Sequence, residues 1–265
     1  MLNLDPTDGQ QLADRADDPP WEAMRRLPVF LLLDTSGSMS GEPIEQVKGG
    51  VQMLVSALRQ DPYALETAYL SVITFGSTAT EAVPLTELAA FQMPPLAASG
   101  ATALGAALEL VATIAAGALA KTTASSKGDW KPMVFLMTDG APTDDWYRGL
   151  QRFQQEKWGI VVACAVNQGD VKVLHAIAGE AVVRLDTCDS SAMSKFFKWV
   201  SASVSSNSKA VETAGKEVEG LAQLPPPPPE IEVVTSQNPA PRHFVPFSKP
   251  CAAFPFTCCS IPPAP

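Results

Sequence analysis

The chain has 265 residues, of which 46% are hydrophobic and 18% are charged, a balance that excludes a fibrous or wholly disordered protein. Its net charge of −9 comes without a cluster of basic and aromatic residues, which argues against a nucleic-acid-binding surface. No apolar run reaches the ~20 residues that span a bilayer, and the first residues lack a secretory signal, so we expect a cytoplasmic protein with no membrane segment.

The two ends of the chain differ in composition from its middle. Residues 1–23 are polar and acidic and include Pro19-Pro20, which predicts a disordered leader; Met24 offers an alternative start of translation that would leave this leader untranslated. Thirteen of the 24 prolines follow residue 224, which predicts a flexible Pro-rich tail over residues 206–265. The folded domain is therefore expected over residues 24–205.

Between these ends, short apolar runs alternate with longer amphipathic segments, a pattern typical of strands and helices in turn. In chain order the predicted elements are a strand at 28–34, a helix at 43–60, strands at 67–76 and 79–85, a helix at 102–119, a strand at 131–139, a helix at 143–158, a strand at 159–166, a helix at 171–179, a strand at 180–186 and a helix at 190–205.

Several predicted strands are apolar at consecutive positions, as in VFLLL, MVFLM and IVVAC. Consecutive apolar residues are typical of parallel strands that are covered by helices on both faces. The sequence therefore predicts a three-layer, doubly wound α/β domain with a mostly parallel sheet. Pro84 cannot donate to a sheet ladder, so the strand at 79–85 is expected to be an antiparallel edge strand.

Oxygen-bearing side chains gather where predicted strands end or long helices begin. Asp34, Ser36 and Ser38 alternate directly after the first strand, Thr102 precedes a long helix, and Asp139 follows the strand that contains MVFLM. In a doubly wound sheet, ligands bind at the carboxyl ends of the strands, so these side chains are expected to meet there. Carboxylate and hydroxyl oxygens suit a hard cation such as Mg²⁺ or Ca²⁺.

These three segments, DTSGS, the Thr ahead of LGAAL, and TDG, resemble the metal-ion-dependent adhesion site of von Willebrand factor A domains over residues 26–205. The resemblance implies a site for Mg²⁺ or Mn²⁺ in which Asp34, Ser36 and Ser38 are ligands, together with Thr102 and, through water, Asp139. Ser99 is a second hydroxyl in the same loop as Thr102, and the spacing to the following helix favours Thr102.

Within this family, the segments RRLPVFLLLDTSGSM and GDWKPMVFLMTDGAPTDDW are most similar to bacterial TerY-type proteins of tellurium resistance and stress response. That resemblance implies a cytoplasmic binding module that works beside a protein kinase and a PP2C-type phosphatase in phosphorylation signalling. The family's mode of binding further implies a protein partner that offers an acidic residue to the metal.

Residues that flank the predicted site are candidates for a rim that contacts the partner. Asp144 and Asp145 are more simply explained as the N-terminal turn of the next helix, where carboxylates are favoured. The candidates are Met39, Ser40, Glu42, Asp144, Asp145 and Trp146.

Three other hypotheses compete with a metal-dependent binding module. Asp34 and its neighbours could be only a helix cap or an Asx-turn, although capping does not require the other two loops. The metal could merely stabilise a structural scaffold. A Mg²⁺-dependent phosphatase of the haloacid dehalogenase type requires a second acid two residues after Asp34, where Ser36 stands. No triad or phosphate-binding motif is visible, so we expect no enzyme.

Overall fold

The computed structural model describes residues 25–123, 126–167, 169–216, 220 and 223–235. The predicted leader, Met24 and residues 236–265 of the predicted tail lie outside the described residues.

A seven-stranded sheet in the order β3-β2-β1-β4-β5-β6-β7 lies at the centre of the described residues. The pairs from β2 to β6 are parallel, whereas β3 pairs antiparallel with β2 and β7 pairs antiparallel with β6. The predicted α/β fold, including its antiparallel edge strand, is therefore confirmed. The strands are β1 (Leu27–Asp34), β2 (Ala68–Phe75), β3 (Ala79–Glu87), β4 (Met133–Thr138), β5 (Ile160–Val166), β6 (Val182–Leu185) and β7 (Glu232–Val233).

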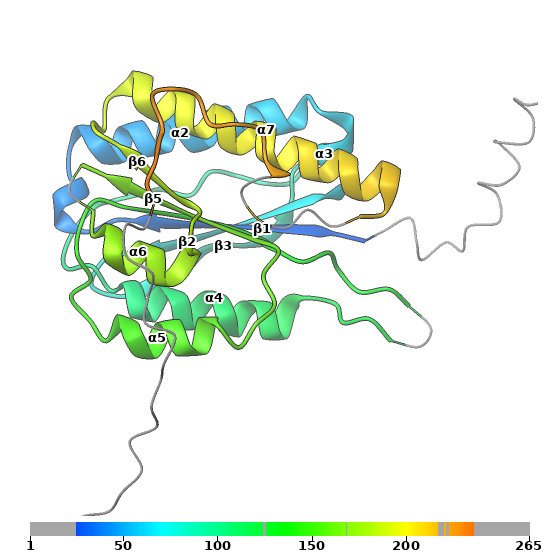
Figure 1. The fold of residues 1–265 in the computed structure, drawn as a ribbon, viewed down its shortest axis with the longest axis horizontal. Helices are drawn as coiled ribbons and strands as arrows, with labels where there is room; N and C mark the ends of the chain where they lie inside the picture. Colours follow the sequence, from blue (N-terminus) through cyan, green and yellow to red (C-terminus); the bar gives the residue numbers. More distant parts are fainter. Residues whose placement is uncertain (1–24, 124–125, 168, 217–219, 221–222, 236–265) are drawn as a thin grey trace, which may run out of the picture. The chain divides into compact units, whose positions relative to one another are not determined.

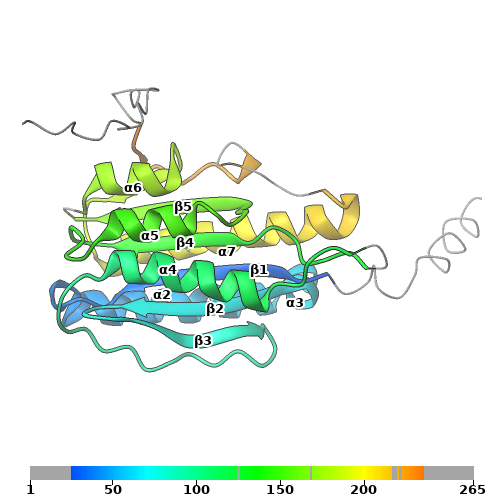
Figure 2. The same ribbon diagram turned by 90° about the horizontal axis from the view of Figure 1, so that it is seen from below.

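Helices cover both faces of this sheet, so every residue of the central strands β1 and β4 is buried. In Figure 1, α2, α3 and α7 lie above the sheet and α4, α5 and α6 lie below it, and Figure 2 shows the lower helices in front of the strands. The helices are α2 (Glu42–Arg59), α3 (Pro62–Thr67), α4 (Leu104–Ala118), α5 (Trp146–Phe153), α6 (Val171–Ala178) and α7 (Ser190–Ala214), with the 3-10 turn η2 (Gly37–Met39) after β1.

The alternation of side chains along each strand divides the apolar core between the two faces of the sheet. Along β1, Val29 and Leu31 belong to the core under α2 and α7, whereas Phe30 and Leu32 belong to the core over α4 and α5. Both cores need apolar residues, so a central strand must be apolar at every position, as the sequence shows.

Both edge strands of the sheet are poorly suited to further pairing. Pro84 lies in the middle of β3, and the register between β2 and β3 shifts on either side of Val72. At the other edge, β7 contains only two residues. Because Pro has no N–H and a shifted register bends the strand, β3 presents an interrupted ladder to its outer side.

The short helix α3 was not predicted, because six residues are too few to show a helical period. Its start is nevertheless encoded locally. Asp61 caps the helix by accepting hydrogen bonds from Tyr63 N and Ala64 N, and Pro62 occupies the first helical position, where a missing N–H costs nothing.

Helix α7 continues nine residues beyond its predicted end, so the predicted start of the tail at residue 206 falls inside it. The buried face that includes Val200 and Val204 continues through Asn207, Ser208 and Val211. Polar residues on that face hide the helical period from a hydrophobicity pattern. These residues therefore belong to the folded domain.

The proline run at 225–229 packs against the domain. The Trp199 indole Nε1 donates to the carbonyl of Pro225 at 2.7 Å, and Lys195 bonds Glu230 at 2.8 Å. Leu224 and Ile231, on either side of the run, are both buried. The segment 223–235 thus passes over α7 and ends beside β6 (Figure 1).

Trp199→Phe should lower the free energy of unfolding by about 1 kcal/mol, the usual value of one hydrogen bond, because the indole donor to Pro225 is lost while the ring remains apolar. The midpoint of urea unfolding measures this change. Trp146→Phe is the control, since that ring lies against the opposite core. A loss in Trp199→Phe no larger than in the control would contradict the packed position of the proline run.

Among the described residues, no helix combines the length and hydrophobicity that crossing a membrane requires.

Candidate metal site

Three loops meet at the edge of the sheet where the parallel strands end. Strands β1 and β4 are neighbours in the sheet, so the loops that follow them start side by side. Backbone hydrogen bonds add the loop ahead of α4, because Gly37 N donates to Gly100 O at 2.9 Å and Thr143 N donates to Thr102 O at 3.0 Å. The expected meeting of the three segments is therefore observed.

The first loop presents two hydroxyls to the third loop. Ser36 Oγ lies 3.0 Å from Ser38 Oγ, and Ser38 Oγ donates to Asp139 Oδ1 at 2.7 Å. Ser36 is buried, whereas Ser38 is exposed. A continuous row of side-chain oxygens thus runs from the interior to the surface.

The carboxylate of Asp34 lies beneath these hydroxyls and is almost completely buried, with 1% of the residue exposed. Its Oδ1 accepts from Ser36 N at 2.8 Å and its Oδ2 accepts from Thr138 Oγ1 at 2.5 Å. Burial raises the pKa of the Asp34 carboxyl; hydrogen bonds from Ser36 and Thr138 oppose that rise, and the negative charge of Asp139 adds to it. A nearby cation would relieve the electrostatic cost of this arrangement.

The hydroxyl of Thr102 completes the group. Thr102 is 6% exposed, and its Oγ1 lies 3.6 Å from the position that a Cβ would take at Gly140. This hydroxyl makes no hydrogen bond within the part of the chain that the structure describes. Although the residue is buried, this oxygen is open to solvent, so it is free to contact a water molecule or a ligand.

These side chains fit a hard divalent cation and not a soft one. The group offers two carboxylates and three hydroxyls, the oxygen ligands that Mg²⁺, Mn²⁺ and Ca²⁺ prefer. Among the described residues, no set of three or more His, Cys, Asp and Glu is placed to hold a metal ion, as a closed zinc site would require.

The rim residues predicted from the sequence have different environments. Ser40 and Glu42 are exposed beside the first loop, and the Ser40 hydroxyl donates to Ala98 O at 3.2 Å. Met39 is 1% exposed and belongs to the core, so its prediction as a rim residue is wrong. It was predicted only from its position after Ser38, and η2 turns its side chain inward.

The three remaining rim residues shape the third loop. Asp145 is exposed and caps α5 by accepting a hydrogen bond from Arg148 N at 3.2 Å. Trp146 is partly buried against the core between the sheet and helices α4 and α5. Asp144 instead accepts from Gly105 N at 3.0 Å and from Ala106 N at 2.9 Å. Asp144 therefore caps α4, the helix that begins just after Thr102, and not the helix that follows it in the chain.

Asp144→Ala should lower the free energy of unfolding by about 1–2 kcal/mol, because two backbone N–H groups at the start of α4 lose their acceptor. Asp144→Asn retains one acceptor oxygen and should lose less. Thermal or urea unfolding in EDTA measures both changes without a contribution from metal. Equal stability of Asp144→Ala and the parent chain would show that this cap is dispensable.

Cys188 is a neighbour of the site that the sequence analysis missed. Burial, together with the negative charges of Asp139, Asp189 and Glu42, raises the pKa of its half-buried thiol to about 11. A thiol held protonated in this way is a poor metal ligand. No local signal links it to the site, since Cys188 lies in the loop after β6.

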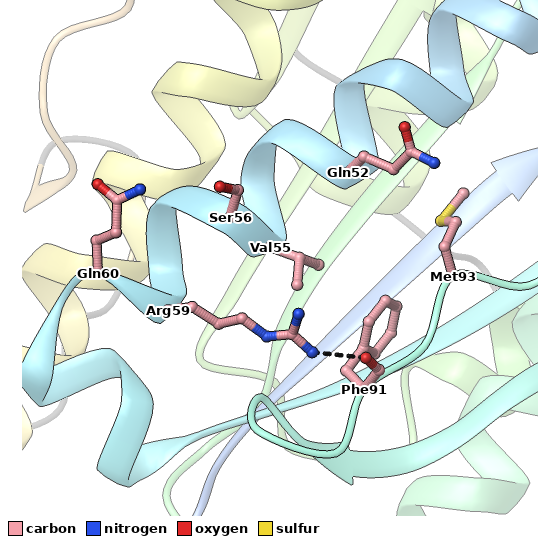
Figure 3. Close-up of a pocket in the computed structure, with 7 residues that line it drawn as sticks. All are labelled: Gln52, Val55, Ser56, Arg59, Gln60, Phe91 and Met93. Carbon is pink, nitrogen blue, oxygen red and sulfur yellow. Dashed lines mark hydrogen bonds between the residues drawn. The ribbon is translucent and has the colours of Figure 1, made fainter.

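A shallow groove of about 330 Å³ lies elsewhere, between the C-terminal half of α2 and the loop after β3 (Figure 3). The Arg59 guanidinium in this groove donates to the carbonyl oxygens of Leu88 and Phe91 and so holds the loop against α2. Val55 and Phe91 contribute apolar surface. Because Arg59 is engaged with backbone carbonyls, the groove is explained as a helix–loop contact.

Comparisons with known proteins agree with the fold. The family model of the von Willebrand factor type A domain matches residues 29–198. An uncharacterized protein of Synechocystis sp. is 35% identical over 152 residues, which are 52% of this chain and 32% of that protein. The match thus spans about a third of the length of this curated relative.

Solved structures of three proteins share the fold at low sequence identity. A von Willebrand factor type A protein from Catenulispora acidiphila is 20% identical with a TM-score of 0.53, over 69% of this chain and 43% of that one. Proximal thread matrix protein 1 from the mussel byssus is 21% identical with a TM-score of 0.52, over 68% and 48%. The pilus adhesin SpaC from Lactobacillus rhamnosus GG is 13% identical with a TM-score of 0.56, over 69% and 30%.

Proposed function

Since the chain belongs to the von Willebrand factor type A domain family, whose members are typically metal-dependent protein-binding modules, we propose that it captures a protein partner through a divalent metal ion. Mg²⁺ is the proposed ion, with Mn²⁺ as an alternative. The proposed ligands are Asp34, Ser36, Ser38, Thr102 and, through water, Asp139.

The row of oxygens from Ser36 through Ser38 to Asp139 carries this proposal. Two further features support it: Asp34 is a buried carboxylate beside a second negative charge, and the hydroxyl of Thr102 makes no hydrogen bond among the described residues. Three loops far apart in sequence contribute these groups. A helix cap or Asx-turn at Asp34 accounts for its contact with Ser36 N but not for the contact of Ser38 with Asp139.

When bound, the ion would supply a Lewis-acid site that accepts an acidic oxygen of the partner. Asp34 and Asp139 together balance the two charges of the ion, and the neutral hydroxyls add none, so the ion would keep a coordination position open for an incoming carboxylate. The exposed Ser38 and the half-buried Asp139 mark the side from which the partner approaches. The domain itself is proposed to be a binding module without catalytic activity.

The proposed setting is a bacterial assembly for tellurium resistance, stress response or phosphorylation signalling, in the cytoplasm. The support is the similarity of RRLPVFLLLDTSGSM to TerY-type proteins. The proposed partners are accordingly a protein kinase and a PP2C-type phosphatase.

A structural scaffold that the metal merely stabilises is the second candidate, because a buried acid such as Asp34 would also gain from a metal without any partner. The phosphatase hypothesis has less support. Ser36 stands where that enzyme class needs its second acid, and its hydroxyl lies against Ser38.

Calorimetric titration of Mg²⁺ and Mn²⁺ into the full chain tests the metal site. Thr102→Val removes only a hydroxyl and should weaken metal binding by at least about 10-fold, a loss typical of perturbed metal sites. Thr113→Val is the matched control, because its hydroxyl bonds only to Glu109 O on the exposed side of α4. Equal metal affinity in Thr102→Val and the parent would count against the site. Capture of a protein from native extract in Mg²⁺ and its loss in EDTA would then test the binding function.

A further inference from the structure

The edge of the sheet that carries the candidate metal site has an unusual charge. The loops that follow β1, β2, β4, β5 and β6, the loop before α4, and the residues that begin α2, α5 and α7 contain eight acidic residues. No Lys or Arg lies in these ranges, which are residues 34–42, 76–78, 97–103, 139–146, 167–170 and 186–190, and the nearest basic residues along the chain include Lys172 in α6 and Arg148 in α5. The acids of this acidic edge are Asp34, Glu42, Asp139, Asp144, Asp145, Asp170, Asp186 and Asp189.

Several of these acids come close together in space. Asp139 acts electrostatically on Asp34, and Asp139, Asp189 and Glu42 all act on the thiol of Cys188. These three acids come from the loop after β4, the cap of α7 and the first turn of α2. They therefore form one side of the rim around the candidate metal site.

The negative charge of this edge is not neutralised by ion pairs. The salt bridges among the described residues lie elsewhere, as in Arg148 with Glu109 and Lys195 with Glu230. Lys195 interacts electrostatically with Asp189, but its ammonium group forms a hydrogen bond with Glu230 at 2.8 Å. Capping places carboxylates beside helix dipoles, which offset only about half a charge at each helix start.

The acidic edge surrounds the candidate metal site. Thr102 is a buried residue whose hydroxyl makes no hydrogen bond in the described part of the chain, and Asp34 is buried beside a like charge. A divalent ion would offset two of the eight charges. The partner would then bring a further carboxylate into a rim that still repels it.

We propose that the partner presents its metal-binding acidic residue within a Lys- or Arg-rich surface. This inference rests on the proposed function, because it concerns the partner of the same metal site. Basic residues around the partner's carboxylate are attracted to Glu42, Asp189 and Asp145. A carboxylate whose neighbours in the partner are acidic or neutral is attracted only by the metal ion and is repelled by these acids. The acidic edge thus discriminates among partners that all carry a suitable carboxylate.

Three synthetic peptides, titrated into the full chain in Mg²⁺ and in EDTA, test this inference. One has a central Asp between pairs of Lys, the second has the same Asp between pairs of Ser, and the third has Asn in place of Asp between pairs of Lys. We expect the Lys-flanked Asp peptide to bind at least about 10-fold more tightly than the Ser-flanked one. Salt at about 1 M, where the Debye length is about 3 Å, should remove most of that difference.

The double variant Glu42→Gln with Asp189→Asn should lose most of the preference for Lys. Asn at 189 retains an acceptor for the cap of α7, so the fold is preserved. The matched control is Glu66→Gln with Glu212→Gln, which removes two charges from α3 and from the C-terminal half of α7. This control should keep the preference for Lys.

The outcomes separate this inference from the proposed function. Equal binding of the two Asp peptides in Mg²⁺, or an unchanged preference in the double variant, overturns the inference and leaves the metal-dependent function standing. Equal binding of Asp and Asn peptides, binding that EDTA does not weaken, or no binding of either Asp peptide overturns the proposed function and the inference with it.

Discussion

Asp34→Asn should abolish the rise in melting temperature that Mg²⁺ is expected to produce in the parent chain. A ligand at about 100 times its Kd stabilises the folded state by about 2.7 kcal/mol, which corresponds to about 5–10 °C for a domain of this size. Asp34 is the buried carboxylate of the candidate site, and Asn has the same shape without the charge. Differential scanning calorimetry in Mg²⁺ and in EDTA measures the melting temperatures of the parent and the variant with and without the metal.

In EDTA the same substitution should leave the melting temperature equal or raise it. Burial and the charge of Asp139 hold the pKa of the Asp34 carboxyl above its ordinary value, so the folded state binds a proton more tightly than the unfolded state. The contribution of Asp34 to stability is therefore lost as pH rises from the unfolded pKa to the folded pKa. Above the folded pKa, the ionised carboxylate costs stability that Asn does not.

The comparison also separates the two candidate functions. If the metal grips a partner, Asp34→Asn should lose both metal-induced stabilisation and partner capture. If the metal only stabilises a scaffold, capture should survive in the variant while the thermal shift disappears. Identical Mg²⁺-induced shifts in the parent and the variant would remove Asp34 from the site.

Gly50→Ala should be strongly destabilising, because α2 and α7 are in close contact at this residue. A Cβ at Gly50 would lie 2.0 Å from a ring carbon of Phe197, and Phe197 is 1% exposed. Because the ring is buried in the core, either it must displace its neighbours or the helices must separate. Overpacking of this kind costs about 1–3 kcal/mol and at times more, and urea unfolding measures it.

Gly49→Ala is the control for this prediction because it is the adjacent residue in the same helix. A Cβ at Gly49 would meet nothing within 4 Å. Replacing an exposed glycine inside a helix by alanine usually stabilises by about 0.5–1 kcal/mol. Opposite signs for the two variants are expected, and a stabilising Gly50→Ala would contradict the close packing of α2 on α7.

Much of the fold could be predicted because its central strands must be apolar on both faces. The run from Val29 to Leu33 has no polar residue, and the structure places it in the middle of the sheet. The end of this apolar run also predicted that Asp34, Ser36 and Ser38 lie where the strand ends. Their direct contacts could not be predicted, since these depend on how the three loops hydrogen-bond one another.

Other features were hidden because they depend on contacts between distant residues. Asp144 caps a helix that begins 40 residues earlier, so no local spacing reveals its partner. Met39 turns inward although the residues on both sides of it are exposed. The end of α7 is buried through Asn207 and Ser208, whose polarity suggested a solvated tail. In each case the tertiary environment decided the outcome against the local pattern.

The interrupted outer side of β3 and the two-residue β7 bear on how copies of this domain meet. A sheet grows from chain to chain only where a long, regular strand leaves its N–H and C=O groups open. Pro84 breaks that regularity at the β3 edge of the sheet, and β7 is too short to offer a regular strand at the other edge. Crowded copies of the domain are therefore expected to resist joining into a continuous intermolecular sheet and to associate, where they do, through helices and loops.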